Sequence, residues 1–124
     1  MKSISGLTCY VSDLAQTADF YKELGFRFGN QDENELIIYL NWFSIRFLTK
    51  NAADNPGSIE EASANSKGEG IFIGIKVGNA DDFYQGLLAK GLKPETEPQA
   101  KPSGSKEFVL RDPDGYKLAF FEKK

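Results

Sequence analysis

The side chains that could do chemistry in this sequence are carboxylates, tyrosines and one thiol, because the chain contains no histidine. Histidine is the commonest general base and the commonest metal ligand, so both roles lose their usual residue. The only cysteine, Cys9, has no histidine to activate it, and we expect it to be a small buried hydrophobic residue. These residue types predict a site with neither a metal nor a cofactor.

Glu122 is the carboxylate in the most suggestive position, since it ends an apolar run that follows the turn Asp112 to Gly115. It could pair with a cationic ligand or accept a proton, and it could equally be a solvated residue near the chain end. The turn itself, Asp-Pro-Asp-Gly, is typical of a reverse turn and lacks the spacing of an EF-hand calcium loop.

Hydrophobic periodicity predicts two helices, each with a capping residue at its start and a glycine at its end. The first follows Asp13 and ends at Gly25, and the second follows Asn79 and ends at Gly91. Runs of β-forming residues predict the strands. These runs lie at 4–12, 26–29, 35–41, 43–49, 71–77, 92–97, 107–111 and 116–122.

The element order strand-helix-strand-strand-strand occurs twice, and both predicted helices contain the triplet Asp-Phe-Tyr. A match in order, triplet and closing glycine indicates a duplicated unit. At 124 residues the chain is long enough for one domain. We expect a first module at about 1–50, a linker at 51–69 and a second module at about 70–124.

Two segments, Tyr10 to Phe26 and Leu110 to Glu122, resemble the vicinal oxygen chelate superfamily. That superfamily includes glyoxalase I, extradiol dioxygenases and bleomycin-binding proteins. The resemblance implies an α+β fold in which two βαβββ modules form an eight-stranded, incompletely closed barrel. Its helices would lie outside the barrel and a ligand cup inside.

In the metalloenzymes of that superfamily, the starts of the first strands and the ends of the last strands supply four metal ligands. The positions that match here are Gly6, Thr49, Phe72 and Glu122. Only Glu122 has a ligand-type side chain, and an open catalytic metal site needs three or more protein donors. The resemblance therefore implies a cup without a metal.

Strand alternation predicts which side chains line the cup. The ligand-binding residues that we expect are Tyr10, Phe43, Phe47, Phe72, Phe108, Phe120 and Glu122, with Tyr39 as a further stacking candidate. Such a surface suits an aromatic or amphipathic organic molecule, although many strand aromatics belong to the core. The same alternation assigns Arg46 and Phe121 to the helix side. A bulge would instead bring Arg46 into the cup, where it would favour an anionic ligand.

These features favour a metal-free protein that binds a small organic molecule, similar to the bleomycin-binding branch, with sequestration of a drug or metabolite as its role. Two alternatives stay open. One is a divergent lyase, isomerase or dioxygenase-type enzyme with Glu122 as base and Tyr10 or Tyr116 as acid, and the other is a regulatory domain with a vestigial cup. We expect a homodimer.

The net charge of −3, with both signs interspersed, argues against a nucleic-acid partner. No apolar run is long enough for a membrane span or a signal peptide. A single cysteine fits a reducing compartment. A cytoplasmic protein is therefore the expectation.

Overall fold

The computed structural model describes residues 2–50 and 67–122. The chain forms two compact units, Met1–Lys67 and Gly68–Lys124. Their boundary falls inside the linker predicted at 51–69, of which residues 51–66 lie outside the described residues. The organisation of both units as a single domain stays a prediction.

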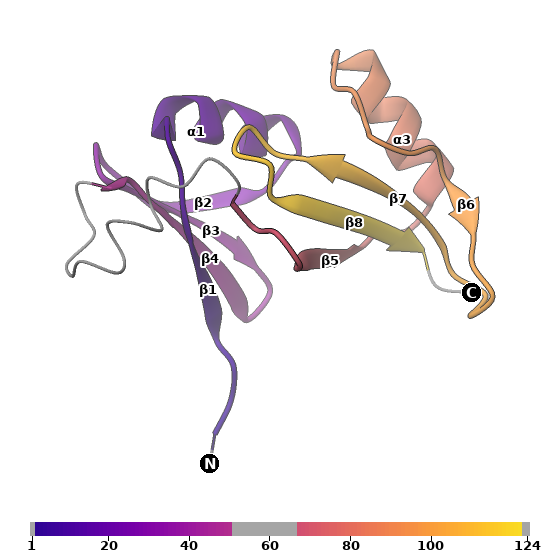
Figure 1. The fold of residues 1–124 in the computed structure, drawn as a ribbon, viewed down its shortest axis with the longest axis horizontal. Helices are drawn as coiled ribbons and strands as arrows, with labels where there is room; N and C mark the ends of the chain where they lie inside the picture. Colours follow the sequence, from indigo (N-terminus) through magenta and orange to yellow (C-terminus); the bar gives the residue numbers. More distant parts are fainter. Residues whose placement is uncertain (1, 51–66, 123–124) are drawn as a thin grey trace. The chain divides into compact units, whose positions relative to one another are not determined.

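The first unit is a four-stranded sheet with one helix (Figure 1). Its elements are β1 (Gly6–Tyr10), α1 (Leu14–Glu23), β2 (Arg27–Gln31), β3 (Glu35–Leu40) and β4 (Phe43–Leu48). The strand order is β1-β4-β3-β2, with β1 parallel to β4 and the other neighbours antiparallel.

The second unit repeats this plan (Figure 1). Its elements are β5 (Phe72–Lys76), α3 (Ala80–Ala89), β6 (Gln99–Ala100), β7 (Lys106–Arg111) and β8 (Lys117–Glu122), in the strand order β5-β8-β7-β6. The predicted α+β fold of two βαβββ units is confirmed. Each sheet stays open, because β5 and β6 are edge strands here as β1 and β2 are in the first unit.

Both helices begin and end where their capping residues predict. The Asp13 side chain accepts a hydrogen bond from the Gln16 N–H (3.1 Å), and the Asn79 side chain accepts one from the Asp82 N–H (2.9 Å). Gly25 and Gly91, with φ of +87° and +83°, adopt the left-handed conformation that ends each helix. Within residues 2–50 and 67–122, no helix is long and apolar enough to span a membrane.

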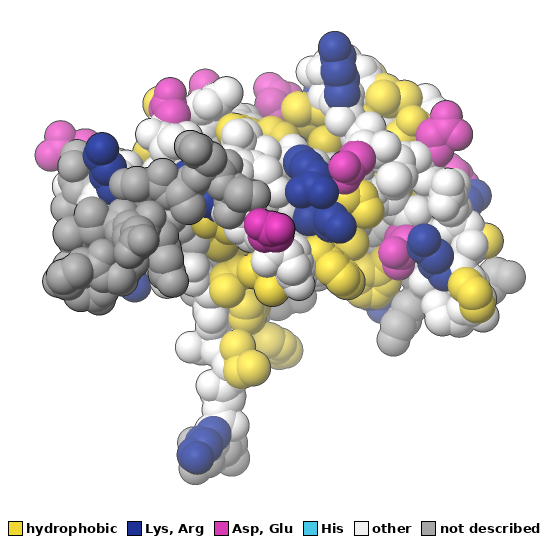
Figure 2. Space-filling view, in the orientation of Figure 1, with side chains coloured by type: hydrophobic (Ala, Val, Ile, Leu, Met, Phe, Trp, Pro, Cys, Tyr) yellow, Lys and Arg dark blue, Asp and Glu magenta, His cyan; other side chains and the backbone are white. Residues whose placement is uncertain are grey.

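Each helix covers one face of the sheet in its own unit, and aromatic rings form the contact. The ring of Tyr21 in α1 lies 4.7 Å from that of Phe47 in β4, and the ring of Phe83 in α3 lies 4.8 Å from that of Phe120 in β8. We call this side of each sheet the helix face and the other side the open face. On the side of the molecule in Figure 2, Lys and Arg side chains lie among Asp and Glu side chains.

The strand predicted at 92–97 is wrong, because the edge strand of the second sheet is β6 at Gln99–Ala100. Pro94 lies within the predicted run and Pro98 follows it, and neither carries an N–H for a strand ladder. Between them, the Glu95 N–H donates to the Val109 carbonyl (2.7 Å), so this segment contacts β7 without forming a strand.

Truncating an aromatic ring should lower the free energy of unfolding much more on the helix face than on the open face. We expect Phe120→Ala, at a fully buried position, to lower the free energy of unfolding by about 3–5 kcal/mol. Phe72→Ala, at a position that is 64% exposed, should change it by less than about 0.5 kcal/mol. Urea unfolding of both variants measures the difference, and equal losses would contradict the assignment of faces.

Candidate functional site

The register of the first sheet assigns each strand side chain to a face. Phe47 packs on α1, so Ile45 shares its face, and both are buried. The alternate residues of β4, among them Arg46 and Leu48, therefore lie on the open face. The prediction that Arg46 faces the helix is wrong, and no bulge interrupts β4. Burying the Phe47 ring is favourable, whereas burying the Arg46 guanidinium would be costly. Phe47 therefore lies on the helix face and Arg46 on the open face.

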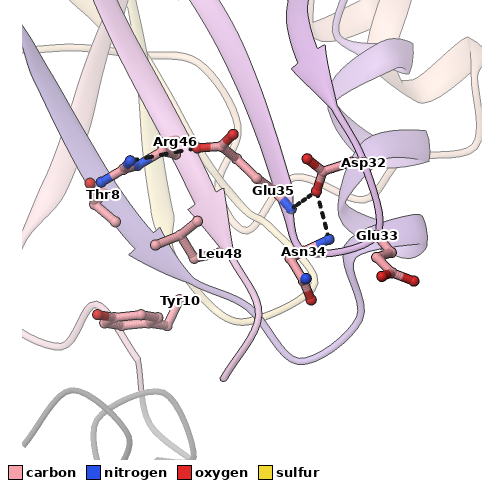
Figure 3. A pocket seen from close by; sticks show the side chains of 8 residues that line it. All are labelled: Thr8, Tyr10, Asp32, Glu33, Asn34, Glu35, Arg46 and Leu48. Atoms are coloured by element: carbon pink, nitrogen blue, oxygen red, sulfur yellow. Dashed lines mark hydrogen bonds and ion pairs between the residues drawn. The ribbon is translucent and has the colours of Figure 1, made fainter. Parts of the chain in front are cut away.

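The open face of the first unit contains a concave pocket of about 760 Å³ (Figure 3). Neighbouring strands place its side chains in rows, in which Thr8 lies beside Arg46 and Tyr10 lies beside Leu48. The turn between β2 and β3 closes one end. The residues that line the pocket are Thr8, Tyr10, Asp32, Glu33, Asn34, Glu35, Arg46 and Leu48.

Asp32 holds that turn together. Its Oδ1 accepts hydrogen bonds from the backbone N–H groups of Asn34 (2.9 Å) and Glu35 (3.0 Å), and its Oδ2 accepts one from the Asn30 side chain (3.3 Å). The hydrogen bond from Asn34 is the largest cause that lowers the pKa of Asp32 below its ordinary 3.8, against a smaller opposing effect of desolvation. A charged Asp32 is thus the form that stabilises the turn.

Arg46 and Glu35 form an ion pair on the wall of the pocket (Figure 3). The Nη1 of Arg46 lies 3.5 Å from the Oε1 of Glu35, whose Oε2 accepts a hydrogen bond from the Asn30 amide (2.9 Å). The two side chains are 49% and 23% exposed, so water screens their attraction. Both groups remain accessible to a molecule in the pocket.

Among the predicted ligand-binding residues, Tyr10 lines the pocket and Phe72 lies on the open face of the second unit. Tyr39, the further candidate, also lies on the open face of the first unit, where the Arg27 guanidinium carbon is 5.5 Å from the centre of its ring. The structure therefore brings only Tyr10 from this set into the pocket of the first unit.

The other predicted aromatic residues lie on the helix faces, away from the pocket of the first unit, and their place in a ligand cup stays a prediction. Phe47, Phe108 and Phe120 are fully buried, and the last two stack on each other at 5.2 Å. Phe43 is half-buried and shares the face of Phe47 by alternation along β4. Phe121, assigned to the helix side, instead lies on the open face with its register partner Lys76.

Glu122 also lies on the helix face, where it stabilises the start of α3. Its Oε1 accepts a hydrogen bond of 2.7 Å from the backbone N–H of Ala80, the first residue of the helix. This carboxylate therefore satisfies one of the unpaired donors at the helix N-terminus and interacts favourably with the helix dipole. Its place in a ligand cup stays a prediction.

The four positions matched to metal ligands do not come together within either unit. The register pairs Gly6 with Ser44 in the first unit and Phe72 with Lys117 in the second. Thr49 and Glu122 each lie five residues beyond these partners, about 16 Å along the strand. Starts and ends of parallel strands lie at opposite ends of a sheet, so these positions cannot share an ion.

The side chains at these positions do not fit a metal either. The Thr49 hydroxyl donates to the Asn34 side chain (3.2 Å), and a Cβ at Gly6 would lie 2.9 Å from the carbonyl oxygen of Ser44. Among the described residues, no group of three or more Asp, Glu, Cys or His side chains could hold an ion. The donors present do not fit the metal of the superfamily's enzymes.

Sequence reasoning missed most of the pocket. Leu48 and the turn from Asp32 to Glu35 were not candidates. The signal for β4 was present, because Phe43, Ile45 and Phe47 form the entirely apolar set of that strand. No local pattern brings the turn beside Arg46, since only the register of β3 on β4 does so.

The family model of the Glyoxalase/Bleomycin resistance protein/Dioxygenase superfamily matches residues 3–120. Together with the two βαβββ units, this match shows that the chain belongs to that superfamily. No protein with a curated description matches the sequence significantly.

Solved structures of other proteins share the fold. A virulence protein from Salmonella typhimurium is 22% identical, with a TM-score of 0.76 over 100% of this chain and 98% of that one. A superfamily member from Sphaerobacter thermophilus is 19% identical, with a TM-score of 0.77 over 99% and 98%. A glyoxalase/bleomycin resistance protein/dioxygenase from Nocardioides is 15% identical, with a TM-score of 0.82 over 99% and 84%.

Acid should loosen the turn at the end of the pocket. Because the pKa of Asp32 is lowered in the folded state, its contribution is present above pH 3.8 and is lost as the pH falls through its lower folded value. We expect the amide signals of Asn34 and Glu35 to shift below pH 3.8 in NMR spectra. Asp32→Asn keeps an oxygen acceptor but should lose this transition. A transition that persists in the variant would contradict the assignment.

Removing the acceptor at the start of α3 should destabilise the protein. We expect Glu122→Ala to lower the free energy of unfolding by about 1 kcal/mol, and Glu122→Gln, which keeps the oxygen, to lower it by about half as much. Urea unfolding checks both values. Equal stability of all three proteins would show that this hydrogen bond does not stabilise the helix.

Proposed function

We propose that this protein binds a small organic molecule in the open-face pocket of its first unit, without a metal ion, and that binding is its function. The observation that carries the proposal is the pocket itself, which combines the apolar surfaces of Tyr10 and Leu48 with the polar groups of Thr8 and Arg46. Binding sites for small molecules commonly combine apolar walls with a few polar groups at such volumes. Sequestration of a drug or metabolite is the role this suggests.

The donor set supports binding without a metal or other cofactor. The chain has no histidine, and the one carboxylate among the family-matched positions is engaged with the N-terminus of α3. The base assigned in an enzymatic alternative, Glu122, lies on the helix face of its sheet, away from the open face. No observation therefore favours catalysis over binding.

The remaining parts of the proposal concern the partner and the compartment. We include a homodimer and a cytoplasmic location, the latter supported by a single buried cysteine that needs no oxidising environment. The ligand is an aromatic or amphipathic molecule, because the Tyr10 ring and the Leu48 side chain offer it apolar contact.

NMR titration of metal-free protein in EDTA tests the proposal, with phenol-bearing fragments of positive, neutral and negative charge as probes. We expect at least one to bind with a Kd on the order of millimolar, a usual affinity for fragments, and to shift the amide signals of Thr8, Arg46 and Leu48. Leu48→Ala should weaken this binding roughly tenfold, because the ligand loses its apolar contact.

Leu88→Ala is the matched control, because Leu88 is a partly exposed leucine on α3 and is not a pocket residue. It should leave the affinity unchanged. The proposal fails if no fragment shifts the pocket amides, or if binding requires an added divalent metal. Conversion of a bound fragment into a product would favour an enzyme over a binding protein.

A further inference from the structure

We propose that the pocket of the first unit selects organic cations, and that the ammonium-type group of the ligand lies at the turn between β2 and β3. This inference rests on the function proposed above and specifies its ligand class. It depends on two features of the pocket: carboxylates outnumber cationic side chains around it, and some of these carboxylates are less engaged by the protein than others.

Carboxylates outnumber cationic side chains around the pocket. Three carboxylates, those of Asp32, Glu33 and Glu35, lie at the turn and at the start of β3, and the single guanidinium of Arg46 lies in the middle of β4 (Figure 3). A concave surface with an excess of one charge attracts a ligand group of the opposite sign and repels a group of the same sign. The end of the pocket at the turn therefore favours a cation.

The three carboxylates differ in their availability to a ligand. Asp32 accepts three hydrogen bonds that hold the turn, so its position is fixed but its oxygens are largely occupied. Glu35 is shared between Arg46 and Asn30. Glu33 is exposed, and no hydrogen bond or ion pair found among the described residues involves it. Glu33 is thus the carboxylate most open to an ammonium group, and Glu35 can be reached only beside Arg46.

Arg46 does not reverse this preference. Its charge is already offset by Glu35, whose Oε1 lies 3.5 Å from the Arg46 Nη1. An anionic ligand would have to compete with Glu35 for the guanidinium while it approaches Glu33. Like charges placed opposite each other across an interface cost affinity.

The apolar side of the pocket agrees with a cation that carries a hydrophobic body. Tyr10 supplies an aromatic ring at the end of β1, and Leu48 lies beside it in the register. Aromatic rings attract cations through their electron-rich faces and also accommodate flat apolar groups. The acidic turn together with this apolar wall points to an amphipathic amine.

Three probes that differ only in their end group provide the test: tyramine, tyrosol and 3-(4-hydroxyphenyl)propionate. All have a phenol ring on a two-carbon arm, which ends in an ammonium, a hydroxyl or a carboxylate. Titration of the full-length protein at pH 7, followed by NMR, gives the Kd of each probe. We expect tyramine to bind about fivefold more tightly than tyrosol and at least about tenfold more tightly than the propionate.

Neutral isosteres locate the cation within the pocket. Glu33→Gln and Glu35→Gln should each reduce the preference for tyramine over tyrosol about threefold and leave tyrosol binding unchanged. Asp19→Asn, on the exposed surface of α1, removes the same charge away from the open face and serves as the control. Raising the salt concentration from roughly 0.02 M to 0.3 M should weaken tyramine binding but not tyrosol binding.

The outcomes separate the two proposals. If none of the probes or other fragments shifts the pocket amides, the proposed function itself fails. If tyrosol or the propionate binds most tightly at the pocket, binding stands and cation selectivity is overturned. If tyramine binds best but neither Gln variant changes its preference, or Asp19→Asn changes it equally, the assignment of the cation to the turn is overturned.

Discussion

The packing of aromatic rings beneath the two helices is the constraint on which the rest of the structure depends. Tyr21 on Phe47 and Phe83 on Phe120 fix one face of each sheet as core. Because side chains alternate along a strand, the same contacts determine which residues are displayed on the other face. Truncating a buried ring costs several kcal/mol, about 3–5, whereas an exposed ion pair contributes about 0–1 kcal/mol, so the polar residues cannot shift this alternation. Arg46 is on the open face because Phe47 is not.

The elements and their order could be read from the sequence because their signals are local. Asp13, Asn79, Gly25 and Gly91 mark the helix ends through contacts and dihedral angles that involve only neighbouring residues. The faces of the strands were harder, because aromatic residues suit both a core and a ligand site. In β8, Leu118 and Phe120 share a face with Glu122, and that carboxylate suggested a polar cup where the helix terminus is in fact the partner. Whether Glu122 faces a ligand site or accepts a hydrogen bond from a helix can be decided only when the position of the start of α3 relative to the end of β8 is known.

The pocket depends on contacts that are distant in sequence, which explains why the turn from Asp32 to Glu35 was not a candidate. Only the antiparallel register of β3 on β4 places Glu35 beside Leu48 and within reach of Arg46. The chain thus has the fold of its superfamily, with a guanidinium, carboxylates and a tyrosine on the open face of its first unit. A site of this composition recognises ligands by charge and apolar contact, whereas a metal site would recognise them through coordination.

The close approach of β1 to β4 at Gly6 limits how such a protein could evolve. A side chain at this position would meet the Ser44 carbonyl oxygen at 2.9 Å, which is backbone and cannot move aside as a flexible side chain would. Acquiring an imidazole here would therefore require a prior change in strand spacing. A ligand side chain at the start of β1 thus depends on the spacing between two strands, whereas the other pocket positions can change their side chains without such a shift.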